Sequence, residues 1–332
     1  MLQTIQHQTS IYHRREADSK LKMGSEDKVK LPVIDFPFLD LESNGSHWES
    51  VKSQVHRALV EYGCFEAVFD KVSLDLRRAL FVELEELFDL PLETKRGVVS
   101  GNPYHGYLEP WNLYESMGID DVDDSEKVEN TTKILWPEGK PSFSKTLQSF
   151  MEQVSRLDQI IRKMSLESLG VEKYLEEHMK STHYLARLIK YSAPQTNEEQ
   201  VGLPEHTDKN TLTILCQNQI DGLELQTKSG EWIKCKPSSP YSFVAFSGDA
   251  FYAWTNGRVH SPHHRVMMTG NETRFSVGLF TVPKPGHMIK APEELVTEEH
   301  PLLFKPYVHS EFMRFLQSSE GEKQALKVYS GV

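Results

Sequence analysis

From about residue 183 onward, short apolar runs follow one another along the sequence, and this pattern restricts the fold more than any other feature. The runs are rich in β-branched and aromatic residues, and Gly, Pro, Asn or Ser separates them about every 8–12 positions. Such spacing is typical of an antiparallel sandwich or barrel. We predict strands in YLARLIKY, TLTILCQ, GLELQT, WIKCKP, YSFVAFS, AFYAW (250–254), HRVMM and RFSVGLFTV.

The sequence before residue 183 has mainly a helical pattern instead. Apolar residues recur three and four positions apart in 48–63, 73–89 and, over the longest stretch, 143–169. Two short strands are predicted beside them, LPVIDF and CFEAVF. The segment 97–141 is rich in Gly, Pro, Asn and Asp, so long loops are predicted there. A last helix is predicted over 308–318.

These patterns divide the chain into three parts. Residues 1–28 are polar and without periodicity, which predicts a disordered leader. Residues 29–182 form a helix-rich region, and residues 183–332 form a β-rich region that ends in a helix. The fold class predicted is therefore α+β.

Charge and cysteine content exclude several classes of function. The net charge of −11 argues against nucleic acid or an anionic membrane as a partner, since both require clustered Lys and Arg. No apolar run reaches the roughly 18 residues of a membrane span. The three cysteines contain no CxxC pair, and no secretory signal is visible. We expect a cytoplasmic protein, and a monomer by default.

Two residues suggest a metal site at the start of a predicted strand. His206 and Asp208 are two positions apart, so in extended chain their side chains point the same way. A third ligand has to come from elsewhere in the β-rich region. The segment NGRVHSPHHRV offers His260, His263 and His264, and spacing alone does not choose among them.

Two imidazoles and one carboxylate form the facial triad of non-haem Fe(II) oxygenases, although a zinc hydrolase can use similar ligands. Arg274 and Ser276 share one face of the next predicted strand. A guanidinium fork beside a hydroxyl suits a carboxylate held at two points. A metal site with an inward carboxylate anchor is what 2-oxoglutarate needs, whereas a zinc hydrolase does not need the anchor.

At these residues the sequence resembles the plant 2-oxoglutarate- and Fe(II)-dependent dioxygenases, over roughly residues 29–330. The matching motifs are His206-Thr-Asp208, Asn256-Gly257, Ser261, His264-Arg265 and Arg274-x-Ser276, with LPVIDF, ELFDLPLETK and WPEG supporting them nearer the N-terminus. The alignment selects His264 as the third ligand. The segment from 254 to 286 looks most like the glucosinolate side-chain dioxygenases and the steroidal-alkaloid hydroxylases of nightshades.

The resemblance implies a double-stranded β-helix, or jelly roll, flanked by N-terminal and C-terminal helices. It implies Fe(II), 2-oxoglutarate and O2 as cofactor and co-substrates, ascorbate as an activator, and release of succinate and CO2. It also implies that the Tyr191 hydroxyl touches the co-substrate. Ile189 departs from the family's Asn, which puts that neighbouring contact in doubt.

The substrate implied is a small plant specialised metabolite, most simply hydroxylated. Phe280 lies on the predicted strand face of Arg274, so we expect it to contact that substrate. Segment 97–141 and the C-terminal helix are expected to close the pocket. Two alternatives remain at this point: a metallohydrolase on a related barrel, and a catalytically silent barrel that binds a small ligand.

Overall fold

Two packed sheets form the centre of the protein in the computed structural model, which describes residues 30–37, 39–317 and 325–332. The predicted leader, 1–28, lies outside the described residues. The larger sheet has eight strands in the order β1 (Val33–Asp35), β2 (Cys64–Val68), β10 (Ser242–Ser247), β7 (Leu212–Gln217), β12 (Arg274–Pro283), β5 (Thr182–Tyr191), β4 (Tyr114–Asp120) and β3 (Tyr107–Trp111). The smaller sheet has four, β6 (Thr196–His206), β11 (His264–Gly270), β8 (Leu223–Gln226) and β9 (Trp232–Lys234).

Apolar side chains from both sheets meet in one buried cluster. The larger sheet contributes Ile189, Leu215 and Phe246, and the smaller contributes Leu225 and Met268. Every strand pair within the two sheets is antiparallel except β1 with β2. This is the jelly-roll core that the sequence predicts, and the two sheets face each other around the cluster.

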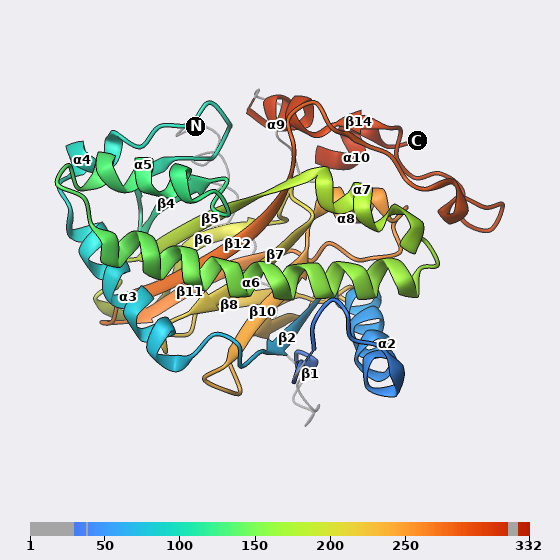
Figure 1. Ribbon diagram of the computed structural model, residues 1–332, viewed down its shortest axis with the longest axis horizontal. Helices are drawn as coiled ribbons and strands as arrows, with labels where there is room; N and C mark the ends of the chain where they lie inside the picture. The colour runs from blue at the N-terminus through green and yellow to red at the C-terminus, as the bar shows by residue number, and fades with distance from the viewer. Residues whose placement is uncertain (1–29, 38, 318–324) are drawn as a thin grey trace.

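Helices cover the other face of the larger sheet (Figure 1). The described residues form α2 (Gly45–Glu61), α3 (Leu74–Asp89), α4 (Leu92–Arg96), α5 (Ser125–Leu135), α6 (Pro141–Ser168), α7 (Leu175–Lys180), α8 (Asp249–Trp254), α9 (His309–Gln317) and α10 (Ala325–Ser330). Of these, α6 runs across the sheet, and α9 and α10 lie beside β14 at the edge of the molecule (Figure 1). Short 3-10 turns cover 172–174 and 293–295, and β13 (Met288–Ile289) pairs with β14 (Tyr307–Val308). The predicted helices 48–63, 73–89, 143–169 and 308–318 match α2, α3, α6 and α9. No helix within the described residues combines the length and apolar character needed to cross a bilayer.

The long helix α6 is joined to the sheet by one buried carboxylate. Asp158 accepts hydrogen bonds from Tyr184 on β5 (2.8 Å) and Thr281 on β12 (2.6 Å), and pairs with Arg162 one turn further along α6 (2.8 Å). Tyr184 and Thr281 lie on the helix-covered face of their strands. Because residues alternate along a strand, their odd-numbered β5 neighbours and even-numbered β12 neighbours face the other sheet. The Asp158 cluster therefore fixes which face of β5 and β12 is turned inward.

Two predictions from the sequence are wrong. Segment 97–141 was predicted as long loops, but it contains β3, β4 and α5. The strand pattern of β4 is hidden because its polar residues, among them Glu115 and Ser116, are themselves buried. AFYAW was predicted as a strand, but it lies in α8; five apolar residues are too few for periodicity to separate a buried strand from a buried helix.

Replacing Asp158 by alanine should destabilise the fold strongly, because Arg162 would be left as a buried cation without a counter-charge. We expect a loss of about 3–5 kcal/mol in the free energy of unfolding, measured by chemical denaturation. Glu152→Ala on the same helix is the matched control, since the Glu152–Arg156 pair is exposed and is worth at most about 0.5 kcal/mol. Equal denaturation midpoints for the two variants would contradict the role given to Asp158.

Candidate active site

The register between β6 and β11 brings two histidines together. His206 ends β6 and His264 begins β11, and the two residues lie directly opposite each other in the antiparallel pair. Their ring centroids are 4.1 Å apart. The neighbouring histidines are placed differently: the His263 ring lies 3.0 Å from the Glu205 carboxylate, and His260 precedes the strand, with its backbone N–H bound to Leu59. Of the three candidates, His264 is the one that the strand pairing places beside His206.

Asp208 completes a group of three ligand atoms. Its Oδ1 atom lies 3.7 Å from Nε2 of His206 and 3.6 Å from Nε2 of His264. Among the described residues this is the one set of three His, Cys, Asp or Glu side chains whose ligand atoms lie within 4.8 Å of one another. Burial lowers the pKa of both imidazoles, that of His206 to about 3, so both rings are neutral at neutral pH. Neutral imidazoles with one carboxylate are ligands that Fe(II) accepts and that Mg²⁺ or Ca²⁺ disfavours.

Asp208 is held in position by one hydrogen bond to its side chain and one to its backbone. Thr213 donates its hydroxyl to the second carboxylate oxygen, Oδ2, at 2.5 Å. The backbone carbonyl of Asp208 accepts from the backbone N–H of Asp249 at 2.8 Å. Oδ1 therefore stays turned toward the histidines.

Asp249, at the start of α8, holds the loop that carries Asp208. Its carboxylate accepts from Thr207 (3.0 Å), Lys209 (2.8 Å) and Ser261 (2.8 Å). The first two flank Asp208, and the third lies ahead of His264, so one buried carboxylate connects both ligand segments. No sequence motif pointed to Asp249, because its partners are about 40 and 12 residues away along the chain. The contact also explains why Ser261 belongs to the matching motif.

Arg274 is fully buried and has no carboxylate partner among the described residues. Its Nη2 donates to Gln217 at 2.8 Å, its Nη1 lies 3.4 Å from the Ser276 hydroxyl, and its Nε has no hydrogen-bond partner. Burial lowers the pKa of this guanidinium. A buried cation with unused donors is costly unless an anion is supplied by a ligand. These residues therefore fit the distal carboxylate of a 2-oxo acid.

The remaining candidate residues lie on the same inward face. Tyr191 is opposite Arg274 in the β5–β12 register, and the guanidinium lies 5.0 Å from the centre of its ring. Ile189 is opposite Ser276 and buried. Phe280 is partly exposed, and its ring lies over Gly278, where an added Cβ would be 2.6 Å away from it. The glycine leaves the room that this ring occupies.

Of the two segments predicted to close the pocket, α9 contacts the loop of Asp208, and segment 97–141 contacts β5. His309 of α9 lies 2.9 Å from the backbone carbonyl of Lys209, next to Asp208. In segment 97–141, His105 binds Asp120, and Asp121 binds His183 of β5 at 2.9 Å. Burial, with smaller contributions from nearby His105 and His183, lowers the pKa of His309 to about 4.

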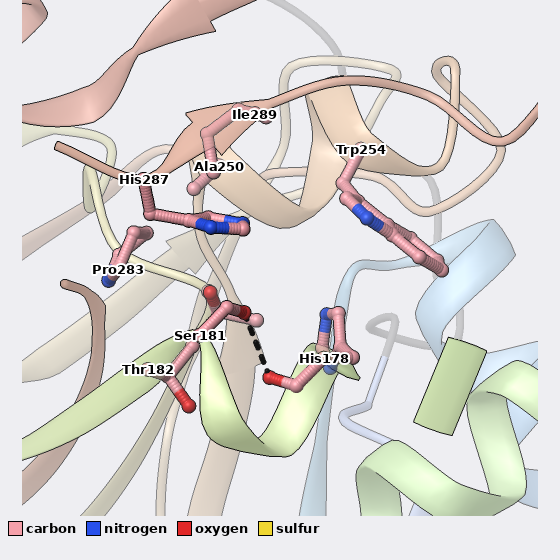
Figure 2. Close-up of a pocket in the computed structure, with 9 residues that line it drawn as sticks. His178, Ser181, Thr182, Ala250, Trp254, Pro283, His287 and Ile289 are labelled. Carbon is pink, nitrogen blue, oxygen red and sulfur yellow. Dashed lines mark hydrogen bonds between the residues drawn. The ribbon is translucent and has the colours of Figure 1, made fainter. Parts of the chain in front are cut away.

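A separate small cavity lies among α7, α8 and the strand ends at Thr182 and Pro283 (Figure 2). His178, Ser181, Trp254 and His287 are among the residues that line it, and none of the candidate site residues does. Its volume of about 10 Å³ accommodates about one water molecule. It is too small for an organic substrate.

Comparisons with known proteins agree with this geometry. The family model described as the 2OG-Fe(II) oxygenase superfamily matches residues 177–283. A second family model, the non-haem dioxygenase in morphine synthesis N-terminal region, matches residues 31–137. The first match covers all three metal-ligand candidates together with Arg274, Ser276, Tyr191 and Phe280.

Individual proteins are similar over most of the chain. A probable 2-oxoglutarate-dependent dioxygenase of Arabidopsis thaliana, AOP1.2, is 50% identical over 298 residues, covering 88% of this chain and 92% of that protein. The crystal structure of a rice dioxygenase for auxin oxidation has a TM-score of 0.79 at 28% identity and covers 91% of this chain and 100% of that one. The Arabidopsis thaliana counterpart in complex with 2-oxoglutarate has a TM-score of 0.73 at 26% identity, covering 82% and 99%.

Removing the Asp249 carboxylate should weaken metal binding without removing a ligand. For Asp249→Ala we expect about a 10- to 100-fold loss of Mn(II) affinity, because the loop carrying Asp208 loses its support. Calorimetric titration measures the affinity, and Asp123→Ala, at an exposed aspartate, is the control. An unchanged affinity in a folded Asp249→Ala protein would show that Asp208 is held without it.

Proposed function

The chain belongs to the plant 2-oxoglutarate- and Fe(II)-dependent dioxygenases, and we propose that it oxidises a small plant specialised metabolite, most directly by hydroxylation. One observation supports this more than any other. The His206, Asp208 and His264 group lies in the same barrel interior as Arg274, a buried cation with no ion pair within 4.0 Å among the described residues. A ligand that binds a metal at one end and carries a carboxylate at the other satisfies both.

Each residue has a defined part in this proposal. His206, Asp208 and His264 would hold Fe(II) and leave three coordination positions open. Fe(II), 2-oxoglutarate and O2, when bound, supply the oxidising power, with succinate and CO2 as co-products. Arg274 and Ser276 orient the co-substrate through its C5 carboxylate, and the Tyr191 hydroxyl assists them. Phe280 contacts the organic substrate.

The protein's own contribution is orientation and a water-poor interior. Arg274 and Ser276 are fully buried, and Tyr191 is nearly so. Charge-assisted hydrogen bonds in such surroundings are stronger than in water and hold the carboxylate in one position. Asp249 and Thr213 hold the carboxylate ligand in the same way. The residues that bind the co-substrate and those that hold the metal ligand are therefore both fixed by buried hydrogen bonds.

Neither of the two alternative functions gives a role to the carboxylate-binding pair, Arg274 and Ser276. A metallohydrolase on a related barrel needs the metal and an activated water, but no buried guanidinium beside them. A catalytically silent ligand-binding barrel has no need of three metal ligands supported by Thr213 and Asp249. We also propose a cytoplasmic monomer without a nucleic-acid partner, activated by ascorbate; the net charge of −11 supports the absence of nucleic acid.

Anaerobic addition of Fe(II) and 2-oxoglutarate should produce a metal-to-ligand charge-transfer band. In Arg274→Gln the band should persist at saturation, but the Kd for 2-oxoglutarate should rise about 100-fold, since charged hydrogen bonds are lost. Arg156→Gln, at an exposed residue of α6, is the control. No band in the wild-type protein, together with Zn(II)-dependent hydrolysis, would favour the hydrolase.

Turnover should consume 2-oxoglutarate and release succinate only when a substrate is present. Incubation with plant extracts should give a product one oxygen atom heavier than its substrate, detected by mass spectrometry, and His264→Ala should abolish it. A product that persists in His264→Ala would contradict the assignment of that residue. Absence of any succinate above background in all extracts would favour the silent barrel.

A further inference from the structure

Arg187 is a second buried cation on the inward face of the larger sheet, and the proposed function gives it no task. It is 8% exposed and lies in the middle of β5. Its position two residues from Ile189 and four from Tyr191 places it on their face of the strand. The residues immediately before and after it, Ala186 and Leu188, pack into the core on the α6 side. Arg187 therefore belongs to the interior that contains the candidate active site.

Each of the two neighbouring strands has a glycine opposite this side chain. Arg187 is opposite Gly278 on β12 and opposite Gly118 on β4. Directly opposite residues share a sheet face, so neither of the two residues directly opposite Arg187 has a side chain of its own. Both positions are crowded, since an added Cβ would lie 2.6 Å from the Phe280 ring at Gly278 and 3.1 Å from the Gly106 backbone at Gly118.

The hydrogen-bond partners of Arg187 are all uncharged. Nη1 lies 3.2 Å from the Tyr114 hydroxyl and 3.0 Å from the Ser116 hydroxyl, and Nη2 donates to the backbone carbonyl of Tyr104. No ion pair within 4.0 Å involves Arg187 among the described residues, which contrasts with the other buried cations.

Four Lys or Arg side chains are buried in the described part of the chain: Lys95, Arg162, Arg187 and Arg274. Lys95 pairs with Glu115 at 2.6 Å, and Arg162 pairs with Asp158 at 2.8 Å. Of these four, the two that face the candidate active site, Arg187 and Arg274, have no Asp or Glu of the described residues within 4.0 Å. A buried charge without a counter-charge is strongly unfavourable, so an anion is expected at each when the site is filled.

The spacing places Arg187 within reach of a small molecule at the metal ligands. Thr213, which holds Asp208, is opposite Phe280, and Phe280 is two residues from Gly278 on β12. Two strand spacings and two residues separate Thr213 from Arg187, which corresponds to about 12 Å between backbone positions. Both side chains shorten the gap, so one small organic molecule can span it.

We propose that Arg187 is an anion-binding residue for the organic substrate, and that this substrate carries a carboxylate or sulfate group. The inference rests on the proposed function, because it assigns the co-substrate to Arg274 and leaves Arg187 for a second anion. A planar guanidinium binds a carboxylate or sulfate at two points, which would fix the substrate's orientation. The anionic group of the substrate would lie at Arg187, and the bond to be oxidised would lie at the other end, toward the metal ligands.

Binding to the protein loaded anaerobically with Fe(II) and 2-oxoglutarate tests the proposal. The probes are cinnamate, 4-phenylbutyrate and octanoate, each with its methyl ester, and hexyl sulfate as the sulfate arm. At least one anion should bind at least about 10-fold more tightly than its neutral counterpart. Arg187→Gln should remove that preference, leave ester binding unchanged, and shift the Kd for 2-oxoglutarate by less than about 2-fold.

Three further proteins sharpen the test. Arg187→Lys should retain part of the preference, because it keeps the charge but loses the two-point geometry. Lys190→Gln lies on the same strand with its side chain on the opposite face, so it should retain all of it. Arg274→Gln should raise the Kd for 2-oxoglutarate about 100-fold, as stated above. The charge-transfer band in wild type and in Arg187→Gln reports on the proposed function separately from substrate binding.

Several outcomes would overturn the proposal. Wild-type protein that binds no anion better than its neutral counterpart contradicts it, as does an equal loss of ester and acid binding in Arg187→Gln. A loss of 2-oxoglutarate affinity in Arg187→Gln comparable to that in Arg274→Gln would assign Arg187 to the co-substrate instead. A lower melting temperature would indicate a structural role, since removing an unpaired buried cation should not destabilise the empty protein.

Discussion

The candidate active site depends on the cross-strand pairing of His206 with His264. This pairing joins the last residue of β6 to the first of β11 and brings two imidazoles from distant segments to 4.1 Å between ring centroids. Because side chains alternate along a strand, a slip of one residue would turn His263 inward and His264 outward. The register is held by buried residues further along β11, Val266 and Met268, which pack between the two sheets. Apolar packing of the barrel thus determines which histidine faces Asp208.

Charge is distributed unevenly over the interior. On the helix-covered side of the larger sheet, the buried cation Arg162 has its own carboxylate partner, and that pair locks α6 to β5 and β12. On the side that faces the smaller sheet, Arg187 and Arg274 have only neutral partners. One face of the same two strands is therefore electrostatically complete, and the other has an excess of positive charge. This contrast is the basis for the two anions proposed above, one on the co-substrate at Arg274 and one on the organic substrate at Arg187.

The sequence predicts those helices, strands and site residues that are recognisable from neighbouring residues in the chain. Long strands such as β5 and β12, the helix α6, and the His206, Asp208, Arg274 and Ser276 spacing all follow from short-range pattern. The family resemblance then selected His264, which the register explains physically. Residues that act through distant contacts gave no such signal. Asp249 supports a loop about 40 residues earlier, and Arg187 is notable only beside Gly118 and Gly278. Strand β4 escaped prediction because burial of Lys95 with Glu115 conceals its alternation.

The order of strands in the larger sheet also has a consequence for the way the chain reaches its native state. Strand β2 pairs with β1 on one side and with β10, roughly 180 residues later, on the other. During synthesis, one edge of β2 therefore has no native partner until most of the chain has left the ribosome. Contacts of such long sequence separation slow folding and expose strand edges to association with other chains. Among the described strands, β2 is the one whose edge waits longest in the sequence for its partner.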